Sequence, residues 1–164
     1  MKLNLGSGHS SKIGYTNVDI YPFDNVDIVH DLEEIPYPFD DNSAVEIYMS
    51  HSLEHVSMTS VPSLLRECYR ILQKNGNLII IVPCIECAMK RFLNEPEESR
   101  WGYVIEYILG NQGRSQQGEQ YHKSGFTPAY LKKLVGDAGF KVKRLFEVEN
   151  NLKMNCIHLD AQKQ

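Results

Sequence analysis

The chain has 164 residues, of which 42% are hydrophobic and 23% charged, and its formal net charge is −4 at pH 7. This length and composition predict a single globular domain spanning residues 1–164, with enough apolar side chains for a core. Lys and Arg form no run, so the sequence lacks the basic footprint of a nucleic-acid-binding protein. No apolar run approaches the roughly 20 residues of a membrane span, and the first residues do not resemble a signal peptide. We therefore expect a cytoplasmic protein without nucleic-acid or membrane partners.

The most informative stretch is Leu3-Asn4-Leu5-Gly6-Ser7-Gly8. Its apolar alternation runs directly into Gly-Ser-Gly, which predicts a buried strand that ends in a turn almost without side chains. Glycine permits positive φ and close approach of a ligand to the backbone, and α/β sheets bind nucleotide-like ligands at the carboxyl ends of their strands. Further on, Asn17-Val18-Asp19-Ile20 forms a second apolar segment, whose one carboxylate is suited to accept hydrogen bonds from the two hydroxyls of a ribose. Together the two stretches predict an adenosine-containing ligand.

Short connections separate the first three expected strands. Residues 9–15 and 21–25 are too short for the helices that usually join parallel strands, so one face of the early sheet is expected to lack its usual cover. A helix begins near Ser60, has Pro62 in its first turn and ends before Gly76. The elements expected in addition are strands at 3–5, 16–20, 26–29, 44–49, 77–83, 141–148 and 155–161, a mostly helical stretch at 85–110, a loop at 110–118 and a helix at 127–139.

The order of these pieces resembles class I S-adenosylmethionine-dependent methyltransferases over nearly the whole chain. The stretches that carry the resemblance are the glycine turn, Val18-Asp19-Ile20, Asp31 with the loop 36–43, the segment 50–56, and the segment 65–72 that leads to Gly76. The resemblance implies a Rossmann-like α/β fold. The implied sheet has seven strands in the order 3-2-1-4-5-7-6 with strand seven antiparallel. This sequence departs from the family in its reduced amino-terminal helices, and we expect a lid of helix and loop inserted at about 85–125.

The resemblance also implies S-adenosyl-L-methionine as cofactor. The glycine turn would pass under its methionine part, Asp19 would hold the ribose hydroxyls, Asp31 and Leu32 would flank the adenine, and Ser50 or His51 would line the sulfonium side. Because the helix after the glycine turn is short or absent, amides at residues 7–10, or Lys12, would have to hold the cofactor carboxylate. The implied cofactor-binding residues are Asn4, Gly6, Ser7, Gly8, Asp19, Ile20, Asp31, Leu32, Ser50 and His51.

Methyl transfer from a sulfonium is an in-line displacement, so positioning supplies much of its acceleration. A general base is needed when the acceptor is protonated, and the candidates after the fourth strand are His51, Glu54 and His55. His51, the nearest to the strand end, is the first catalytic residue that we expect. His122, in the segment Tyr121-His122-Lys123, is the second. The expected substrate is a small, anionic or sugar-like acceptor, because the lid region carries aromatic and cationic side chains: Arg100, Trp101, Tyr103, Tyr107, Arg114, Tyr121 and Lys123. The alternative is that these aromatic side chains only pack against the rest of the fold.

The loop His51-Ser52-Leu53-Glu54-His55 also has the H-x-x-E-H spacing of some zinc peptidases. That chemistry needs the motif on a helix with a distant third ligand, whereas here the motif lies in the methyltransferase loop. A divalent cation held at this loop is a second alternative, but His51 stands where a hard cation would favour an acid. We therefore predict no metal, and interpret Glu54 and His55 as a structural pair.

Cys84 and Cys87 have the spacing of half a zinc site without a second pair to complete it. We interpret these cysteines, with Cys68 and Cys156, as structural thiols, in keeping with a cytoplasmic location.

Two other functions share parts of the pattern. A nicotinamide-dependent oxidoreductase needs a third glycine where Ser11 stands, and an acid about 20 residues further along, whereas Asp19 follows the glycine turn closely. A non-catalytic cofactor-binding subunit of a partner enzyme fits the reduced helices. Since exposed apolar sheet surface promotes association, we also expect the uncovered face to be buried by a second copy in a homodimer, or by the insertion at 98–120.

Overall fold

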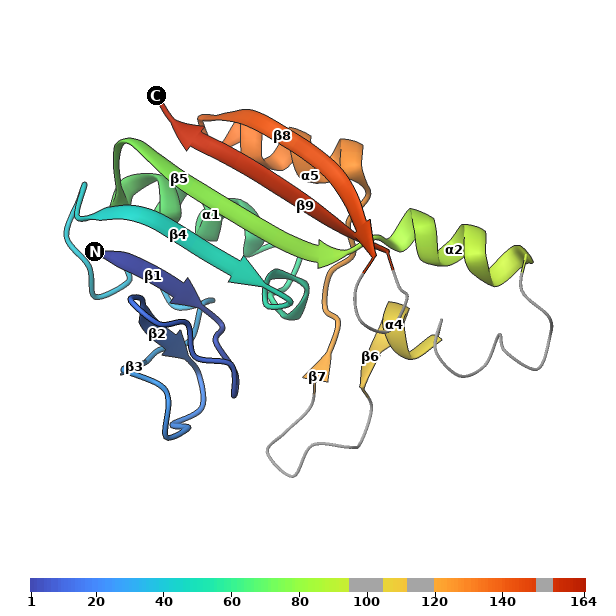
Figure 1. Cartoon of the computed structure of the whole chain (residues 1–164), viewed down its shortest axis with the longest axis horizontal. Coiled ribbons are helices and arrows are strands. Elements are labelled where there is room, and N and C mark those ends of the chain that lie inside the picture. Colours follow the sequence, from blue (N-terminus) through green and yellow to red (C-terminus); the bar gives the residue numbers. More distant parts are fainter. Residues whose placement is uncertain (95–104, 112–119, 150–154) are drawn as a thin grey trace.

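The structure is a computed structural model that describes residues 1–94, 105–111, 120–149 and 155–164. A seven-stranded sheet runs in the order β3-β2-β1-β4-β5-β9-β8 (Figure 1). The first five strands are mutually parallel, and β9 is antiparallel to both β5 and β8. The strands are β1 (Lys2–Leu5), β2 (Thr16–Asp19), β3 (Ile28–Val29), β4 (Ala44–Ser50), β5 (Leu72–Pro83), β8 (Phe140–Glu149) and β9 (Asn155–Lys163). This confirms the predicted Rossmann-like order 3-2-1-4-5-7-6 with an antiparallel seventh strand.

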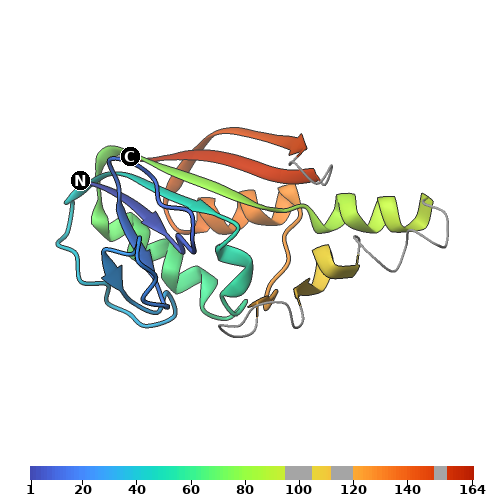
Figure 2. The same cartoon turned by 60° about the horizontal axis from the view of Figure 1, so that its bottom comes forward.

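One face of the sheet is covered by α1 (Val61–Ile71) and α5 (Pro128–Asp137), as Figure 2 shows. Both helices carry apolar residues at i, i+3 and i+4, which places these side chains on a single stripe against the sheet. The stripe of α1 is fully buried at Leu64, Leu65 and Cys68. The core therefore lies between this helical layer and the inward side chains of β1, β4, β5 and β9.

A second group of elements lies beyond the carboxyl end of β5. It contains α2 (Ile85–Asn94), α4 (Ile105–Leu109), and a small hairpin of β6 (Gly110–Asn111) and β7 (Gln120–Tyr121). These elements belong to the insertion expected at 85–125, and the hairpin was not predicted. None of the helices among the described residues is both long and apolar enough to cross a bilayer.

The boundaries of α1 and β5 differ from those predicted. The helix ends at Ile71, and β5 begins already at Leu72, because Leu72 pairs with Ala44 of β4. Ser60 precedes the helix, but its hydroxyl does not cap it; instead it donates a hydrogen bond to Glu33 at 3.0 Å. Both differences come from partners distant in sequence, which a local pattern does not contain. β3 is likewise shorter than predicted.

Two of the four cysteines are joined. Cys84 and Cys87 form a disulfide at the start of α2, so they are not the structural thiols that the sequence analysis assumed. Cys68 and Cys156 are buried thiols.

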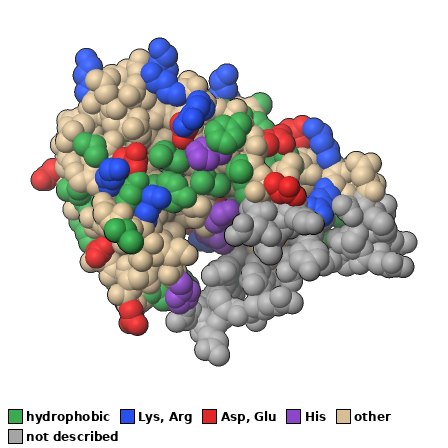
Figure 3. Space-filling view, viewed as in Figure 1, with side chains coloured by type: hydrophobic (Ala, Val, Ile, Leu, Met, Phe, Trp, Pro, Cys, Tyr) green, Lys and Arg blue, Asp and Glu red, His purple; other side chains and the backbone are tan. Residues whose placement is uncertain are grey.

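The opposite face of the sheet carries no helix in the described part of the chain (Figures 1 and 2). This agrees with the expectation from the short connections, since residues 6–15 turn directly from β1 to β2. Partly exposed side chains of four neighbouring strands lie on this face. Tyr48 of β4 is paired with Ile79 of β5, and Ile81 of β5 is paired with His158 of β9, which is paired in turn with Phe146 of β8. We call these five residues the open face. Figure 3 shows hydrophobic side chains flanked by Lys and Arg on this side.

Charged side chains border the open face in pairs. Nη2 of Arg144 lies 2.6 Å from Oδ2 of Asp160, and Nζ of Lys2 lies 3.6 Å from Oε1 of Glu46. The Lys12 ammonium sits 4.2 Å from the ring centroid of Tyr48. Lys12 is therefore engaged in a cation–π contact on the open face.

Candidate functional site

The glycine turn lies at the carboxyl end of β1, where parallel strands place ligands. Gly6 and Gly8 have φ angles of 71° and 53°. A Cβ atom on Gly6 would lie 2.3 Å from Cβ of Ser52, whereas one on Gly8 would meet no heavy atom within 4 Å. Gly6 is thus required by its contact with the chain itself, while the space beside Gly8 is open to a ligand.

Asp19 ends β2 next to this turn, and its carboxylate is buried. Oδ2 accepts a hydrogen bond from the amide of Gly8 at 2.8 Å, and Oδ1 accepts one from the amide of Tyr21 at 3.0 Å. An ionised carboxylate offers about four acceptor positions. Asp19 therefore holds the glycine turn in place and still has acceptor capacity for a ligand.

Two buried hydroxyls beside the turn have no hydrogen-bond partner among the described residues. They are the Oγ atoms of Ser7 and Ser52. In contrast, the amides of Ser7, Gly8 and Ser10 already donate hydrogen bonds within the chain. Buried polar groups without partners usually mark a missing ligand or water. The polar end of an amino-acid-like ligand thus fits the two hydroxyls better than the amides that the sequence analysis favoured; Ser52 was missed because only folding brings it to Gly6.

Some of the other predicted cofactor residues support the glycine turn or the core, and others have exposed side chains beside the turn. Asn4 is buried and donates to Oδ1 of Asn17 at 2.9 Å, which supports the turn from behind. Ile20 follows β2 with 49% of its surface exposed. Leu32 is buried in the core, and Asp31 accepts a hydrogen bond from a neighbouring amide at 2.8 Å. The structure thus places five of the predicted residues at the carboxyl ends of β1 and β2: Gly6, Ser7, Gly8, Asp19 and Ile20.

His51 follows β4 directly and adopts a φ of 53°. Its Nε2 lies 3.6 Å from Sγ of Cys156, and its Nδ1 lies 3.3 Å from Oε1 of Glu54. These contacts, first with Cys156 and then with Glu54, raise the pKa of His51 to about 10. His51 is therefore protonated at pH 7 and does not accept a proton there. The Cys156 contact was not predicted, because 105 residues separate the two side chains.

His122 reaches the same region from the segment before α5. The amides of Lys123 and Ser124 donate to the carbonyl oxygen of Glu54 at 2.8 and 3.0 Å, so this segment is held against the turn at Leu53–His55. Burial lowers the pKa of His122, which leaves its imidazole neutral at pH 7. A pocket opens here, lined by Glu54 and His122 together with Pro83, Ile85, Tyr107 and Phe126.

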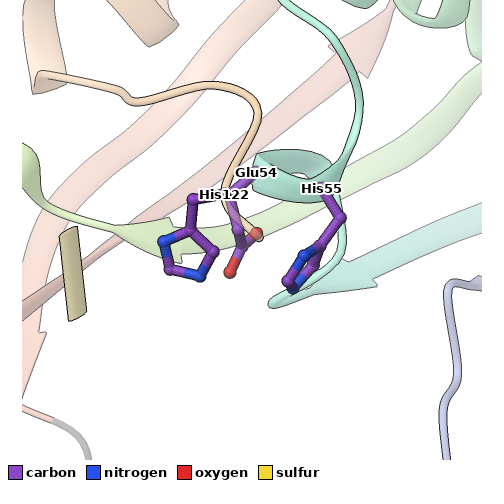
Figure 4. Close-up of side chains that lie close together, drawn as sticks. All are labelled: Glu54, His55 and His122. Atoms are coloured by element: carbon purple, nitrogen blue, oxygen red, sulfur yellow. The ribbon is translucent and has the colours of Figure 1, made fainter. Parts of the chain in front are cut away.

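Glu54 and His55 do not pair with each other as the sequence analysis expected. Glu54 faces His51, and Nδ1 of His55 lies 3.0 Å from the carbonyl oxygen of Tyr121. Figure 4 shows the Glu54 carboxylate between the rings of His55 and His122.

The aromatic lid is described only in part. Tyr107 donates a hydrogen bond to the carbonyl oxygen of Asn155 at 2.6 Å and lies 3.2 Å from Sγ of Cys156, so α4 is anchored on the start of β9. Tyr121 is 38% exposed. The other candidates, Arg100, Trp101, Tyr103 and Arg114, lie outside the described residues.

Lys123 makes an ion pair across the site that gives a pH-dependent prediction. Its Nζ lies 2.9 Å from Oε1 of Glu33, and this contact, with hydrogen bonds from Ser57 and Ser60, lowers the pKa of Glu33 from 4.5 to about 2. Because the folded pKa lies below the ordinary value, Glu33 stabilises the fold above pH 4.5, and this stabilisation disappears as the pH falls toward 2.

We expect Glu33→Gln to lower the free energy of unfolding by about 1–3 kcal/mol at pH 7. The difference from wild type should shrink below about pH 4.5. Urea titrations at several pH values measure this difference. The exposed neighbour Glu34 supplies the control Glu34→Gln, and a constant wild-type-to-Glu33→Gln difference down to pH 3 would contradict the prediction.

Comparison with known proteins agrees with this architecture. Residues 12–80 match the family model described as a methyltransferase domain, in a range that begins after the glycine turn. No curated protein sequence matches the chain.

Solved structures match over almost the full length. A SAM-dependent methyltransferase of Methanosarcina mazei has 19% identity and a TM-score of 0.69, with 99% of this chain and 91% of that chain covered. The 1,6-didemethyltoxoflavin-N1-methyltransferase of Burkholderia thailandensis, with bound 1,6-didemethyltoxoflavin and S-adenosylhomocysteine, has 15% identity and a TM-score of 0.66, covering 99% and 70%. A putative methyltransferase of Haloferax volcanii, in complex with the Trm112 methyltransferase activator, has 14% identity and a TM-score of 0.66, covering 99% and 82%.

The strand order and these matches lead to one assignment. The sheet order with its antiparallel strand β9 is shared with the solved methyltransferases, and the family model matches the segment that contains Asp19 and the turn before α1. The chain therefore has the fold of class I S-adenosylmethionine-dependent methyltransferases, and its residues 12–80 match the family model described as a methyltransferase domain.

Proposed function

We propose that this protein transfers the methyl group of S-adenosylmethionine to a small-molecule acceptor. The observation that carries the proposal is the set of groups around Gly8: open space beside its Cα, the buried carboxylate of Asp19, and the unpartnered hydroxyls of Ser7 and Ser52. These groups match a ligand with both a ribose and an amino-acid end. In our proposal, Asp19 accepts hydrogen bonds from the ribose hydroxyls, and the two serines face the methionine part.

The sulfonium supplies an electrophilic methyl with a good leaving group. The protein's part is then mainly to hold the acceptor in line, which is worth up to roughly 7–11 kcal/mol for ideal orientation. His51 and His122 are the catalytic residues we propose, in different protonation states. The imidazolium of His51 attracts an anionic acceptor, and the neutral imidazole of His122 accepts the proton of a protonated one, a contribution of about 10²–10⁴-fold. An anionic or sugar-like acceptor agrees with this combination.

The structure bears on the oxidoreductase alternative. Nicotinamide-binding folds place the pyrophosphate at the N-terminus of a helix that follows the glycine turn. In this chain residues 6–15 contain no helix between β1 and β2. The chain therefore lacks, between β1 and β2, the helix N-terminus at which a dinucleotide pyrophosphate is usually bound.

Calorimetric titration with S-adenosylhomocysteine and with NAD tests the choice of cofactor, and we expect saturable binding of the first alone. Transfer of a labelled methyl group from S-adenosylmethionine into a pool of small metabolites then tests catalysis. Binding without any transfer would favour the non-catalytic subunit, and binding of NAD alone would overturn the proposal.

We further propose that the open face is covered by a second copy of the chain. Its hydrophobic centre is bordered by ion pairs of both signs, such as Arg144–Asp160, so two copies can face each other without net repulsion. Phe146 belongs to this face on the edge strand β8, and its side chain is 42% exposed. The activator bound to the Haloferax protein shows that a solved structure of this fold has a protein partner, and such a partner is the other outcome of the test.

We expect wild-type protein to elute as a dimer in size-exclusion chromatography with light scattering, with about twice the chain mass of 18.8 kDa. Phe146→Glu should convert it to a monomer, because a charge would be buried in the interface without a partner. Tyr130→Glu, at a residue 40% exposed on α5, is the control and should remain dimeric. A monomeric wild type at high concentration would contradict self-association.

A further inference from the structure

We propose that Glu54, His55 and His122 form a binding site for a divalent transition-metal ion. Each residue offers one ligand atom, and the three atoms lie within 4.8 Å of one another. Around tetrahedral zinc, ligand atoms at about 2.0–2.2 Å from the metal are roughly 3.4 Å apart, so small side-chain movements close the site. Figure 4 shows the carboxylate between the two imidazoles, which come from segments far apart in the sequence.

The Glu54 carboxylate is the strongest indication of a cation. Its side chain is only 2% exposed, and Oε1 lies 3.3 Å from Nδ1 of His51. Oε2 is buried without a hydrogen-bond partner among the residues that the structure describes. A buried carboxylate oxygen without a partner is costly, and a bound cation satisfies it.

His55 is oriented as metal-binding histidines commonly are. A carbonyl oxygen only accepts hydrogen bonds, so the contact of 3.0 Å between the Tyr121 carbonyl and Nδ1 of His55 requires the proton on Nδ1. The lone pair is then on Nε2. A hydrogen bond from the other ring nitrogen to a backbone carbonyl is the usual outer support of a histidine ligand.

His122 is brought to the site by the backbone. The hydrogen bonds from the amides of Lys123 and Ser124 to the carbonyl oxygen of Glu54 hold the segment of His122 against the turn that carries the other two ligands. The rings of His55 and His122 have centroids 5.1 Å apart, with an angle of 73° between their planes. The site therefore uses parts of the chain that the fold already fixes relative to each other.

The donor set indicates which ions fit. Two imidazoles and one carboxylate suit zinc or another transition metal, while magnesium and calcium favour oxygen ligands. Three protein ligands leave a further coordination position, as in catalytic rather than structural zinc sites. Glu54 and His122 also line the pocket, which has room for about one water molecule at that position. The second cluster of this kind, Cys84 with Cys87 and Glu147, is occupied by the disulfide.

Metal binding and proton acceptance are alternative uses of the same atom. A His122 nitrogen that coordinates a cation has no lone pair left for the acceptor's proton. The metal site does not depend on S-adenosylmethionine, so its test is independent of the proposed methyl transfer.

The test is a calorimetric titration of the untagged full-length chain with zinc. Reductant is left out so that the disulfide stays intact. We expect one zinc ion per chain, and a loss of affinity of about 100-fold in Glu54→Gln and in His122→Ala. Magnesium should bind neither to wild type nor to these two variants. His30→Ala, which removes an imidazole elsewhere on the chain, is the matched control and should bind zinc like wild type.

Thermal unfolding supplies a second readout that does not depend on activity. In zinc, wild type and His30→Ala should unfold at a higher temperature than in EDTA, whereas Glu54→Gln and His122→Ala should unfold at the same temperature in both. Zinc affinity unchanged in Glu54→Gln and His122→Ala, or absence of stoichiometric binding, would overturn the site. Zinc binding that disappears instead in Cys84→Ser would assign the ion to the cysteine cluster and also overturn it.

Discussion

Replacing Asp19 by alanine should weaken the binding of S-adenosylhomocysteine by roughly 10²–10⁴-fold. The carboxylate is expected to accept two charge-assisted hydrogen bonds from the ribose hydroxyls, each worth about 1.5–3 kcal/mol, and about 1.4 kcal/mol corresponds to a factor of ten in affinity. Isothermal titration calorimetry measures the effect directly, and methyl transfer should fall in parallel at cofactor concentrations that saturate wild type.

Asp19 also supports the glycine turn through the amide of Gly8, so the alanine variant needs a companion. Asp19→Asn keeps an acceptor oxygen and should preserve more of the turn, while it still loses the charge that strengthens bonds to the hydroxyls. Asp24→Ala, at an exposed acid in the following loop, serves as the control. If the Asp19 variants are folded by circular dichroism and bind S-adenosylhomocysteine as tightly as wild type, the proposed cofactor site is wrong.

Replacing Gly6 by alanine should destabilise the fold by about 2–5 kcal/mol. A φ of 71° costs a residue with a Cβ about 1–2 kcal/mol. The added methyl would also lie 2.3 Å from Cβ of Ser52, and overpacking of this kind costs about 1–3 kcal/mol more. The midpoint of urea unfolding measures the combined effect, and Ser52→Gly in the same chain should recover part of it.

Gly8→Ala is the matched variant, because its φ of 53° carries a similar backbone cost but no heavy atom lies within 4 Å. Its stability should fall by only about 1–2 kcal/mol. Its methyl group would instead enter the space proposed for the cofactor, so affinity for S-adenosylhomocysteine should fall at least tenfold. If Gly6→Ala and Gly8→Ala lower the stability equally, the proposed clash between residue 6 and Ser52 is wrong. If Gly8→Ala binds S-adenosylhomocysteine as tightly as wild type, the proposed cofactor space beside Gly8 is wrong.

Local patterns in the sequence were sufficient for the framework of the fold. The buried strand before Gly6, the stripe of α1 and the continuous apolar run of β5 each depend on residues close in sequence, and all three are present. The helix predicted from residue 127 is α5, and Thr127 caps it by accepting a hydrogen bond from the amide of Tyr130 at 3.2 Å. The uncovered sheet face also followed from the length of the connections between strands, because residues 6–15 leave no room for a helix.

The chemistry of the site depended on contacts between distant segments, and the sequence did not contain them. His51 was a candidate base by position, yet its protonation state depends on Cys156 and Glu54. The early start of β5 follows from its pairing with β4.

The sequence by itself determined the order of the elements, the bare turn at Gly6 and Gly8, and the acid that ends β2, because each arises from neighbouring residues. Only the tertiary structure decided which imidazole is neutral and which buried oxygen lacks a partner. Burial and hydrogen bonding shift the pKa of a side chain according to what surrounds it in space, and at His51 those surroundings are Cys156 of β9 and Glu54 of the following turn.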